Sequence, residues 1–217
     1  SGWKIEKVSD RKVRDEWKPL WGKRAVVEDH FNELVIDLVN PAGQPERMQL
    51  VVRGYNDGFA FCYKIPDGKG PCVNVQSELT AYNFAGDYTA WFYNGENHNI
   101  GPEKLTETDG TRLPVMTVKA GDKHYMAIHE ACLETGAPLV LQSKGGESLF
   151  SVASKPTSLS PGYTSAWRVV LYGTTPGVLT DSHLLELLNP DPDSRYDFSW
   201  VKPGLAVWDW RINGAVW

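Results

Sequence analysis

The sequence predicts a many-stranded all-β protein with one short helix, arranged as a sandwich or a barrel. About ten short apolar segments follow one another along the 217 residues, with turn signals between them. The 20 glycines and 14 prolines suit many strands joined by short turns. Only residues 181–188 have a helical pattern, since Thr180 or Asp181 can cap a row of leucines that ends at Asn189-Pro190.

The elements are expected in the following order. Residues 1–30 are polar and rich in charge, and we expect most of them to form an arm on a larger body. Residues 94–110 are predicted to form a long polar loop. Strands are predicted at residues 33–39, 48–55, 59–65, 72–82, 89–93, 113–118, 124–131, 138–142, 148–153 and 165–173.

The clearest hairpin signal is Asn56-Asp57-Gly58, which lies between two apolar runs. Asp57 is therefore interpreted as a turn residue. Three cysteines make at least one thiol unpaired. Cys62 and Cys72 flank the predicted turn at residues 67–70 but are not directly opposite each other, which favours free thiols over a disulfide.

Charge and composition exclude several classes of function. The net charge of −5 and the pI near 5.5 provide no basic surface for nucleic acid. No apolar run approaches the ~20 residues of a membrane span. The motifs of zinc proteases, serine hydrolases and phosphate-binding loops are absent.

The segment 197–210 (DFSWVKPGLAVWDW) is dense in aromatic residues. Pro203 and Gly204 predict a bend, and residues 205–208 are expected to start a new buried strand. An apolar segment of this kind, if left uncovered, favours self-association, and we expect contacts between copies at the C-terminus.

Three motifs in order carry a family resemblance: residues 55–61 (YNDGFAF), His129-Glu130-Ala131 and the segment 197–210. Together they resemble the N-terminal part of glycoside hydrolase family 97. The resemblance implies a large antiparallel β-sandwich, of the galactose-mutarotase-like supersandwich type, over residues 1–196. It also implies that residues 197–217 are a linker and the start of a catalytic TIM barrel.

The same resemblance implies a function. Family members hydrolyse α-glucosides or α-galactosides with carboxylates on the barrel, so we name no catalytic residue here and expect this chain alone to be inactive. Calcium-dependent members take one metal ligand from the sandwich, which we place at Glu130, with Glu78 as the second choice. The alternative is that Glu130 contacts an arginine or backbone amides. One ligand does not hold calcium, so the site is expected to be incomplete in this chain.

His129 is a candidate sugar contact or a structural histidine, and Trp208 and Trp210 are candidate substrate-binding residues at the barrel entry. The implied partners are an α-glycoside substrate and the chain's own catalytic barrel, and the implied location is periplasmic or secreted. Two other readings remain open: a stand-alone carbohydrate-binding β-sandwich, and a structural domain without a ligand.

Overall fold

The computed structural model describes residues 2–43, 45–95, 97–134, 137–190 and 195–206. Within them the regular secondary structure is mostly antiparallel sheet, as predicted. The helical elements are the 3₁₀ turn η1 (Leu105–Glu107) and the helices α1 (Pro176–Asp181) and α2 (Leu184–Leu187). The strands are β1 (Lys4–Trp17), β2 (Val27–Val39), β3 (Arg47–Tyr55), β4 (Gly58–Lys64), β5 (Val73–Val75), β6 (Ala81–Asn83), β7 (Thr89–Tyr93), β8 (Ile100–Lys104), β9 (Asp109–Lys119), β10 (Tyr125–Ala131), β11 (Leu141–Lys144), β12 (Leu149–Val152), β13 (Thr157–Leu159) and β14 (Trp167–Gly173).

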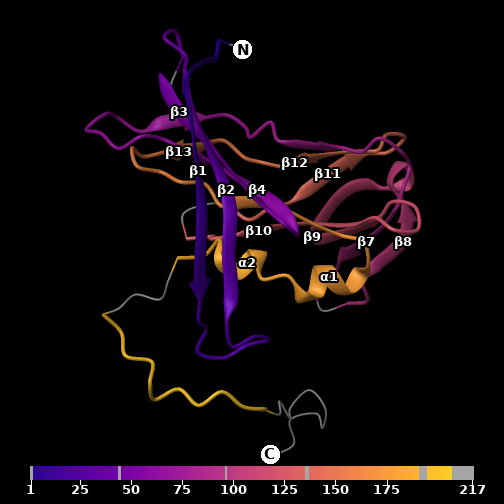
Figure 1. The fold of residues 1–217 in the computed structure, drawn as a ribbon. Coiled ribbons are helices and arrows are strands. Elements are labelled where there is room, and N and C mark those ends of the chain that lie inside the picture. Colours follow the sequence, from indigo (N-terminus) through magenta and orange to yellow (C-terminus); the bar gives the residue numbers. More distant parts are fainter. Residues whose placement is uncertain (1, 44, 96, 135–136, 191–194, 207–217) are drawn as a thin grey trace, which may run out of the picture.

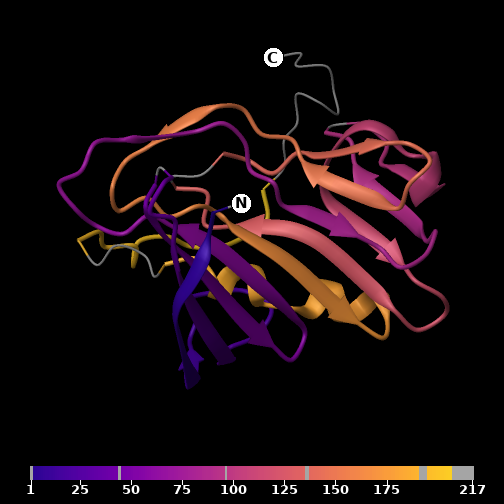
Figure 2. The same cartoon turned by 90° about the horizontal axis from the view of Figure 1, so that it is seen from above.

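The strands follow the order β1-β2-β3-β4-β14-β10-β9-β11-β12-β6, with β7 and β8 attached to β9 and a separate pair formed by β13 and β5. Strand β9 joins the two layers of the sandwich. Its first residues, 109–112, pair with β11, and residues 116–119 pair with β10. The sheet thus folds back on itself along β9 (Figures 1 and 2).

Two apolar cores result, one on each face of the central strands. Alternation along β14 sends Trp167, Val169 and Leu171 into the first core, where they pack with Leu184 and Leu188 of the helical segment. Figure 2 shows α1 and α2 along this face of the sheet. The second core lies between β7, β9, β10, β11 and β12, and its largest members are Phe92 and Phe150.

The hairpin predicted at Asn56-Asp57-Gly58 is confirmed, with Tyr55 opposite Gly58 and the turn at residues 56–57. Gly58 lies so close to β14 that an added Cβ would stand 2.3 Å from the Val170 carbonyl oxygen. Asp57 also accepts a hydrogen bond at its carbonyl from the Tyr172 amide, at 2.8 Å. The turn is therefore fixed against β14 by backbone contacts.

The N-terminal arm is part of the sheet. Residues 4–17 form the edge strand β1, which is almost wholly exposed and pairs with β2 along its length. Within β2, only residues 32–39 pair with the next strand, β3. The lower half of the β1–β2 ribbon consequently projects away from the rest of the sheet (Figure 1).

Two predicted segments need correction. Residues 94–110 are not one long loop, because they contain β8, which pairs with β7, and η1, whose Leu105 is fully buried. Strand β8 is short and mostly polar, so the sequence lacks the apolar alternation that would indicate its pairing with β7. Residues 72–82 form two short strands, β5 and β6, instead of one, and the connection between them carries Glu78.

The predicted helix at residues 181–188 is shorter in the structure, where α2 covers Leu184–Leu187 and a separate helix, α1, ends at Asp181. Asp181 is the last residue of α1 and caps no helix, because Ser182 has an extended backbone that interrupts the helical path. Ser182 Oγ then accepts a hydrogen bond from the Leu184 amide, at 3.1 Å, at the start of α2. The predicted apolar leucine side is confirmed, since Leu184 and Leu188 are buried.

Cys62, Cys72 and Cys132 are all free thiols, as expected. Towards the C-terminus, Leu205 and Ala206 are exposed and belong to no strand of the described residues, so the expected buried strand is not found at these two positions. Trp208 and Trp210 lie outside the described residues. Among the helices that are described, none combines the length and apolar character that crossing a bilayer requires.

Candidate functional site

The candidate site is organised around the buried guanidinium of Arg168. Arg168 is on β14, on the face opposite Trp167 and Val169, and is only 4% exposed to solvent. A buried cation requires charged or hydrogen-bonded partners. Arg168 Nε and Nη2 donate to the two oxygens of Glu78 at 3.0 and 2.6 Å, a bidentate pair. The loop between β5 and β6 thereby fastens onto the central strand.

Glu130 is the second partner of Arg168. The two residues are directly opposite each other on β10 and β14. Arg168 Nη1 lies 3.4 Å from Glu130 Oε2, and the Leu139 amide donates to the same oxygen at 2.6 Å. Glu130 therefore makes the contacts with an arginine and a backbone amide that the sequence analysis gave as the alternative to metal binding.

Burial is the main influence on the ionisation of Glu130, and it raises the pKa of this carboxyl above its ordinary value. The Leu139 amide and Arg168 act in the opposite direction, and the nearby Glu78 adds to the rise. Burial also acts to lower the pKa of Arg168, but the hydrogen bond and charge of Glu78 raise it above its ordinary value. The centre thus combines two carboxylates with one permanent cation.

His129 does not share this centre. As β-strand alternation requires, it points to the other face of β10 from Glu130. Its Nδ1 accepts a hydrogen bond from the Glu130 amide at 2.8 Å, and burial lowers the pKa of its ring. Near pH 7 His129 is therefore a neutral histidine whose Nδ1 carries no proton.

Sequence reasoning did not single out Arg168 or the tyrosines around it. Tyr63, Tyr82 and Tyr163 all interact electrostatically with Arg168, and burial raises the pKa of each phenol. Tyr63 Oη also lies 3.0 Å from Thr80 Oγ1. One signal in the sequence could have found the Arg168 centre: Arg168 is the single charged residue of the apolar run WRVVLY. A cation in a buried strand needs a partner, so this residue indicates a buried ion pair.

The donor chemistry of Glu130 suits a calcium ligand. Glu130 presents a buried carboxylate, the hard oxygen donor that calcium prefers. Calcium takes about six to eight oxygens. Within the described ranges, however, no group of three or more histidine, cysteine, aspartate or glutamate side chains is placed to hold a metal.

The strand order defines an antiparallel β-sandwich domain, and the Arg168 centre lies in its interior. The chain matches the family model described as Glycosyl-hydrolase 97 N-terminal over residues 1–190. It therefore belongs to the family of glycoside hydrolase 97 N-terminal domains.

Curated relatives agree with this assignment. The chain is 26% identical over 244 residues to a retaining alpha-galactosidase of Bacteroides thetaiotaomicron, covering 93% of this chain and 36% of the relative. It is 29% identical over 224 residues to a probable retaining alpha-galactosidase of Streptomyces bingchenggensis, covering 94% and 32%. The chain thus spans about a third of the length of these relatives.

A solved structure shares the fold. A glycoside hydrolase family 97 enzyme from Pseudoalteromonas sp. strain K8, in complex with acarbose, superposes with a TM-score of 0.81 at 26% identity. The match covers 94% of this chain and 32% of that one. The predicted family and the predicted β-sandwich are both confirmed.

Proposed function

We propose that this chain is the non-catalytic N-terminal domain of an α-glycosidase that acts on α-galactosides or α-glucosides. The observation that carries the proposal is the family match over residues 1–190 of a chain that covers about a third of its relatives. The two relatives described above are named as a retaining and a probable retaining alpha-galactosidase, which favours α-galactosides among the two substrate classes. The domain would shape the rim of an active site built on a following barrel.

We further propose that Glu130 lends one ligand to a calcium ion whose other ligands come from that barrel. The fixed position of the carboxylate supports this role, since Arg168 and the Leu139 amide hold Oε2 in place. Calcium, when bound, would add positive charge next to the sugar. Arg168 would orient Glu130, and Trp208 and Trp210 would contact the substrate near the junction. His129 points to the other face of β10 and would be a structural histidine that accepts the hydrogen bond of the Glu130 amide.

The first test is the coding sequence after the codon for Trp217. The proposal requires it to continue into alternating strands and helices that bear carboxylates suited to glycoside hydrolysis. The 217-residue chain should not hydrolyse aryl α-galactosides or aryl α-glucosides, whereas the longer polypeptide should. Turnover by the 217-residue chain alone would refute the non-catalytic role.

The calcium role is tested separately. In the longer polypeptide, Glu130→Gln should raise the calcium concentration needed for half-maximal activity by at least roughly tenfold. Glu147→Gln, a change of the same kind outside the Arg168 centre, is the matched control and should leave this concentration unchanged. An unaltered calcium requirement in Glu130→Gln would refute the ligand assignment. We also propose export to the periplasm or the medium, which cell fractionation of the source organism would test.

A further inference from the structure

The loop at the end of the β1–β2 ribbon presents large apolar side chains to solvent. It spans residues 18–26, between the last residue of β1 and the first residue of β2. Within it Leu20 is 80% exposed and Trp21 is 68% exposed. These two residues form an apolar tip that no part of the described chain covers. Neighbouring exposed apolar side chains of this size mark a surface that meets a partner.

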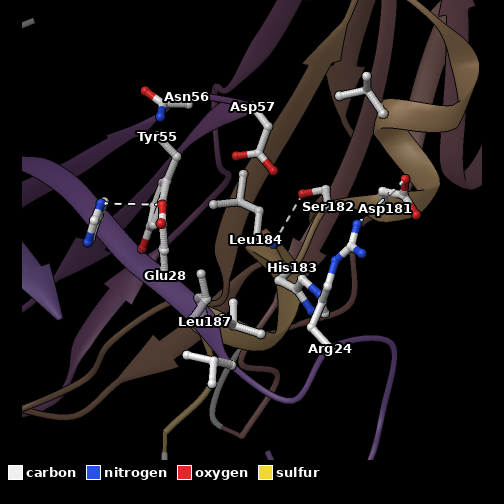
Figure 3. Close-up of a pocket in the computed structure, with 14 residues that line it drawn as sticks. Arg24, Glu28, Tyr55, Asn56, Asp57, Asp181, Ser182, His183, Leu184 and Leu187 are labelled. Carbon is white, nitrogen blue, oxygen red and sulfur yellow. Dashed lines mark hydrogen bonds and ion pairs between the residues drawn. The ribbon is translucent and has the colours of Figure 1, made fainter. Parts of the chain in front are cut away.

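The loop is fastened to the helical segment behind the apolar tip. Lys23 Nζ donates hydrogen bonds to the carbonyl oxygens of Thr180 and Ser182, both at 2.8 Å. Arg24 approaches Asp181 within 4.0 Å (Figure 3). These contacts tie the loop to the junction of α1 and α2. The apolar tip is therefore held in one place before any partner binds, which lowers the entropy cost of binding.

The neighbouring cavity of the domain does not take up the apolar tip. A pocket of about 470 Å³ lies between β2, the β3–β4 turn and the helical segment (Figure 3). Arg24, Tyr55 and His183 line this pocket, whereas Leu20 and Trp21 do not. The two side chains face solvent instead, so a partner outside the described residues is needed to bury them.

The chain leaves the sandwich on the side to which the ribbon projects. Both the end of the β1–β2 ribbon and residues 195–206 lie below the sheet in Figure 1. Residues 195–206 also carry exposed aromatic side chains, Tyr196 and Trp200. A domain that follows residues 195–206 is consequently on the side of the sheet where the apolar tip lies.

The charge of the loop indicates the chemistry of the partner surface. Residues 17–27 include three cations and no acidic residue, in a chain of net charge −5. Lys23 and Arg24 face the helical segment, and among the described residues Lys18 has no such contact. An apolar pocket with an acidic rim complements this arrangement. The barrel of the proposed function bears carboxylates for hydrolysis and for calcium, whereas an anionic membrane repels the net negative domain.

We propose that the apolar tip docks on the catalytic barrel, with Leu20 and Trp21 in an apolar pocket of the barrel and Lys18 beside a carboxylate at its rim. This inference rests on the proposed function, because it requires that barrel. The apolar tip adds a second contact to the covalent connection through residues 195–206. Two separate contacts fix the orientation of the sandwich relative to the barrel, which one flexible connection does not.

The first experiment compares hydroxyl-radical labelling of the 217-residue chain and of the longer polypeptide, each at about 5 µM to limit self-association. Trp21 should be labelled at least about tenfold more slowly in the longer polypeptide, because interface cores are packed as tightly as protein interiors. Tyr93, an exposed residue of β7, is the internal control and should be labelled equally in both chains. Equal labelling of Trp21 in both chains would overturn the proposal.

The second experiment separates docking from a role inside the sandwich. Its readout is the urea midpoint of the sandwich, followed by hydrogen exchange of β14 peptides. Leu20→Ser with Trp21→Ser should leave this midpoint unchanged in the 217-residue chain and lower it in the longer polypeptide. Tyr93→Ser with Leu113→Ser, an exposed cross-strand pair, is the matched control and should shift both chains equally. An equal response of both chains to the changes at the apolar tip would contradict docking.

The outcomes distinguish this inference from the proposed function. If the longer polypeptide hydrolyses α-glycosides while Trp21 stays fully labelled, only the docking inference fails. If no barrel follows Trp217, both fail together. Protection of Trp21 in the 217-residue chain itself, at about 100 µM protein or with phosphatidylglycerol vesicles, would assign the apolar tip to a second copy or to a membrane surface and would also overturn the inference.

Discussion

Arg168 and Glu130 are directly opposite each other on β14 and β10, and Arg168 Nη1 lies 3.4 Å from Glu130 Oε2. The same guanidinium makes a tighter, bidentate contact with Glu78. One buried cation therefore joins a central strand pair to the loop between β5 and β6. This relationship links the stability of the fold to the position of the carboxylate that we propose as a calcium ligand.

Removing the cation should destabilise the domain strongly. Arg168→Met leaves Glu78 and Glu130, whose side chains are 18% and 6% exposed, without their shared partner. We expect a loss of about 3–5 kcal/mol in the free energy of unfolding, measured with urea near pH 7. Adding Glu78→Gln and Glu130→Gln to this variant should restore part of the loss, since the uncompensated charges are then gone.

The matched control for that change is Arg47→Met. Arg47 on β3 forms an ion pair with Glu6 on β1, and both side chains are exposed, so solvent screens the pair. The Arg47→Met variant should have the same midpoint of urea unfolding as the unaltered chain. If Arg168→Met were as stable as Arg47→Met, the buried network would contribute nothing and the account given above would be wrong.

The pH dependence of stability should identify the ionisation of Glu130. Its pKa is raised in the folded state above the ordinary value of 4.5, mainly by burial. The folded chain thus holds this proton more tightly than the unfolded chain. The resulting stabilisation is fully present below pH 4.5 and is lost as the pH rises through the folded-state pKa.

Glu130→Gln stays neutral at every pH and lacks this loss. The stability of Glu130→Gln relative to the unaltered chain should therefore increase between about pH 4 and about pH 7, as measured by urea unfolding at both pH values. The Leu139 amide can still donate to the amide oxygen of glutamine, which preserves the local geometry. A constant or decreasing difference would show that burial does not dominate the ionisation of Glu130.

The β3–β4 turn offers a prediction about backbone packing. An alanine Cβ at position 58 would stand 2.3 Å from the Val170 carbonyl oxygen and 3.0 Å from Leu184 Cδ2. Gly58→Ala should therefore cost at least about 2 kcal/mol in unfolding free energy, because β14 and the helical segment must both move. In the same hairpin, Gly54→Ala meets no atom within 4 Å and serves as the control.

The exposed C-terminal aromatic segment should cause self-association of the 217-residue chain. Trp200 is 76% exposed and Leu205 is fully exposed, so apolar surface faces solvent. Light scattering should show a mass that rises with protein concentration, and Trp200→Ser with Leu205→Ser should reduce the rise. A monomer mass that persists up to about 1 mM would contradict this expectation.

The local sequence was sufficient where short-range chemistry decides the structure. The Asn56-Asp57-Gly58 turn, the strand at residues 165–173 and the opposite orientation of His129 and Glu130 all follow from turn chemistry and from the two-residue period of a strand. The motifs at residues 55–61, 129–131 and 197–210 were also enough to indicate the family that the comparison over residues 1–190 shows.

The tertiary structure decided everything that depends on residues distant in the chain. Glu78 and Arg168 are 90 positions apart, and Tyr55 and His183, which line one pocket, are farther apart still, so no spacing rule could bring either pair together. The β8 strand was hidden for the same reason, since its polar sequence becomes a strand only beside β7. Residue types and local periods determine which segments can be strands, whereas the pairing of a buried charge and the lining of a cavity are determined only when the sheet folds back on itself.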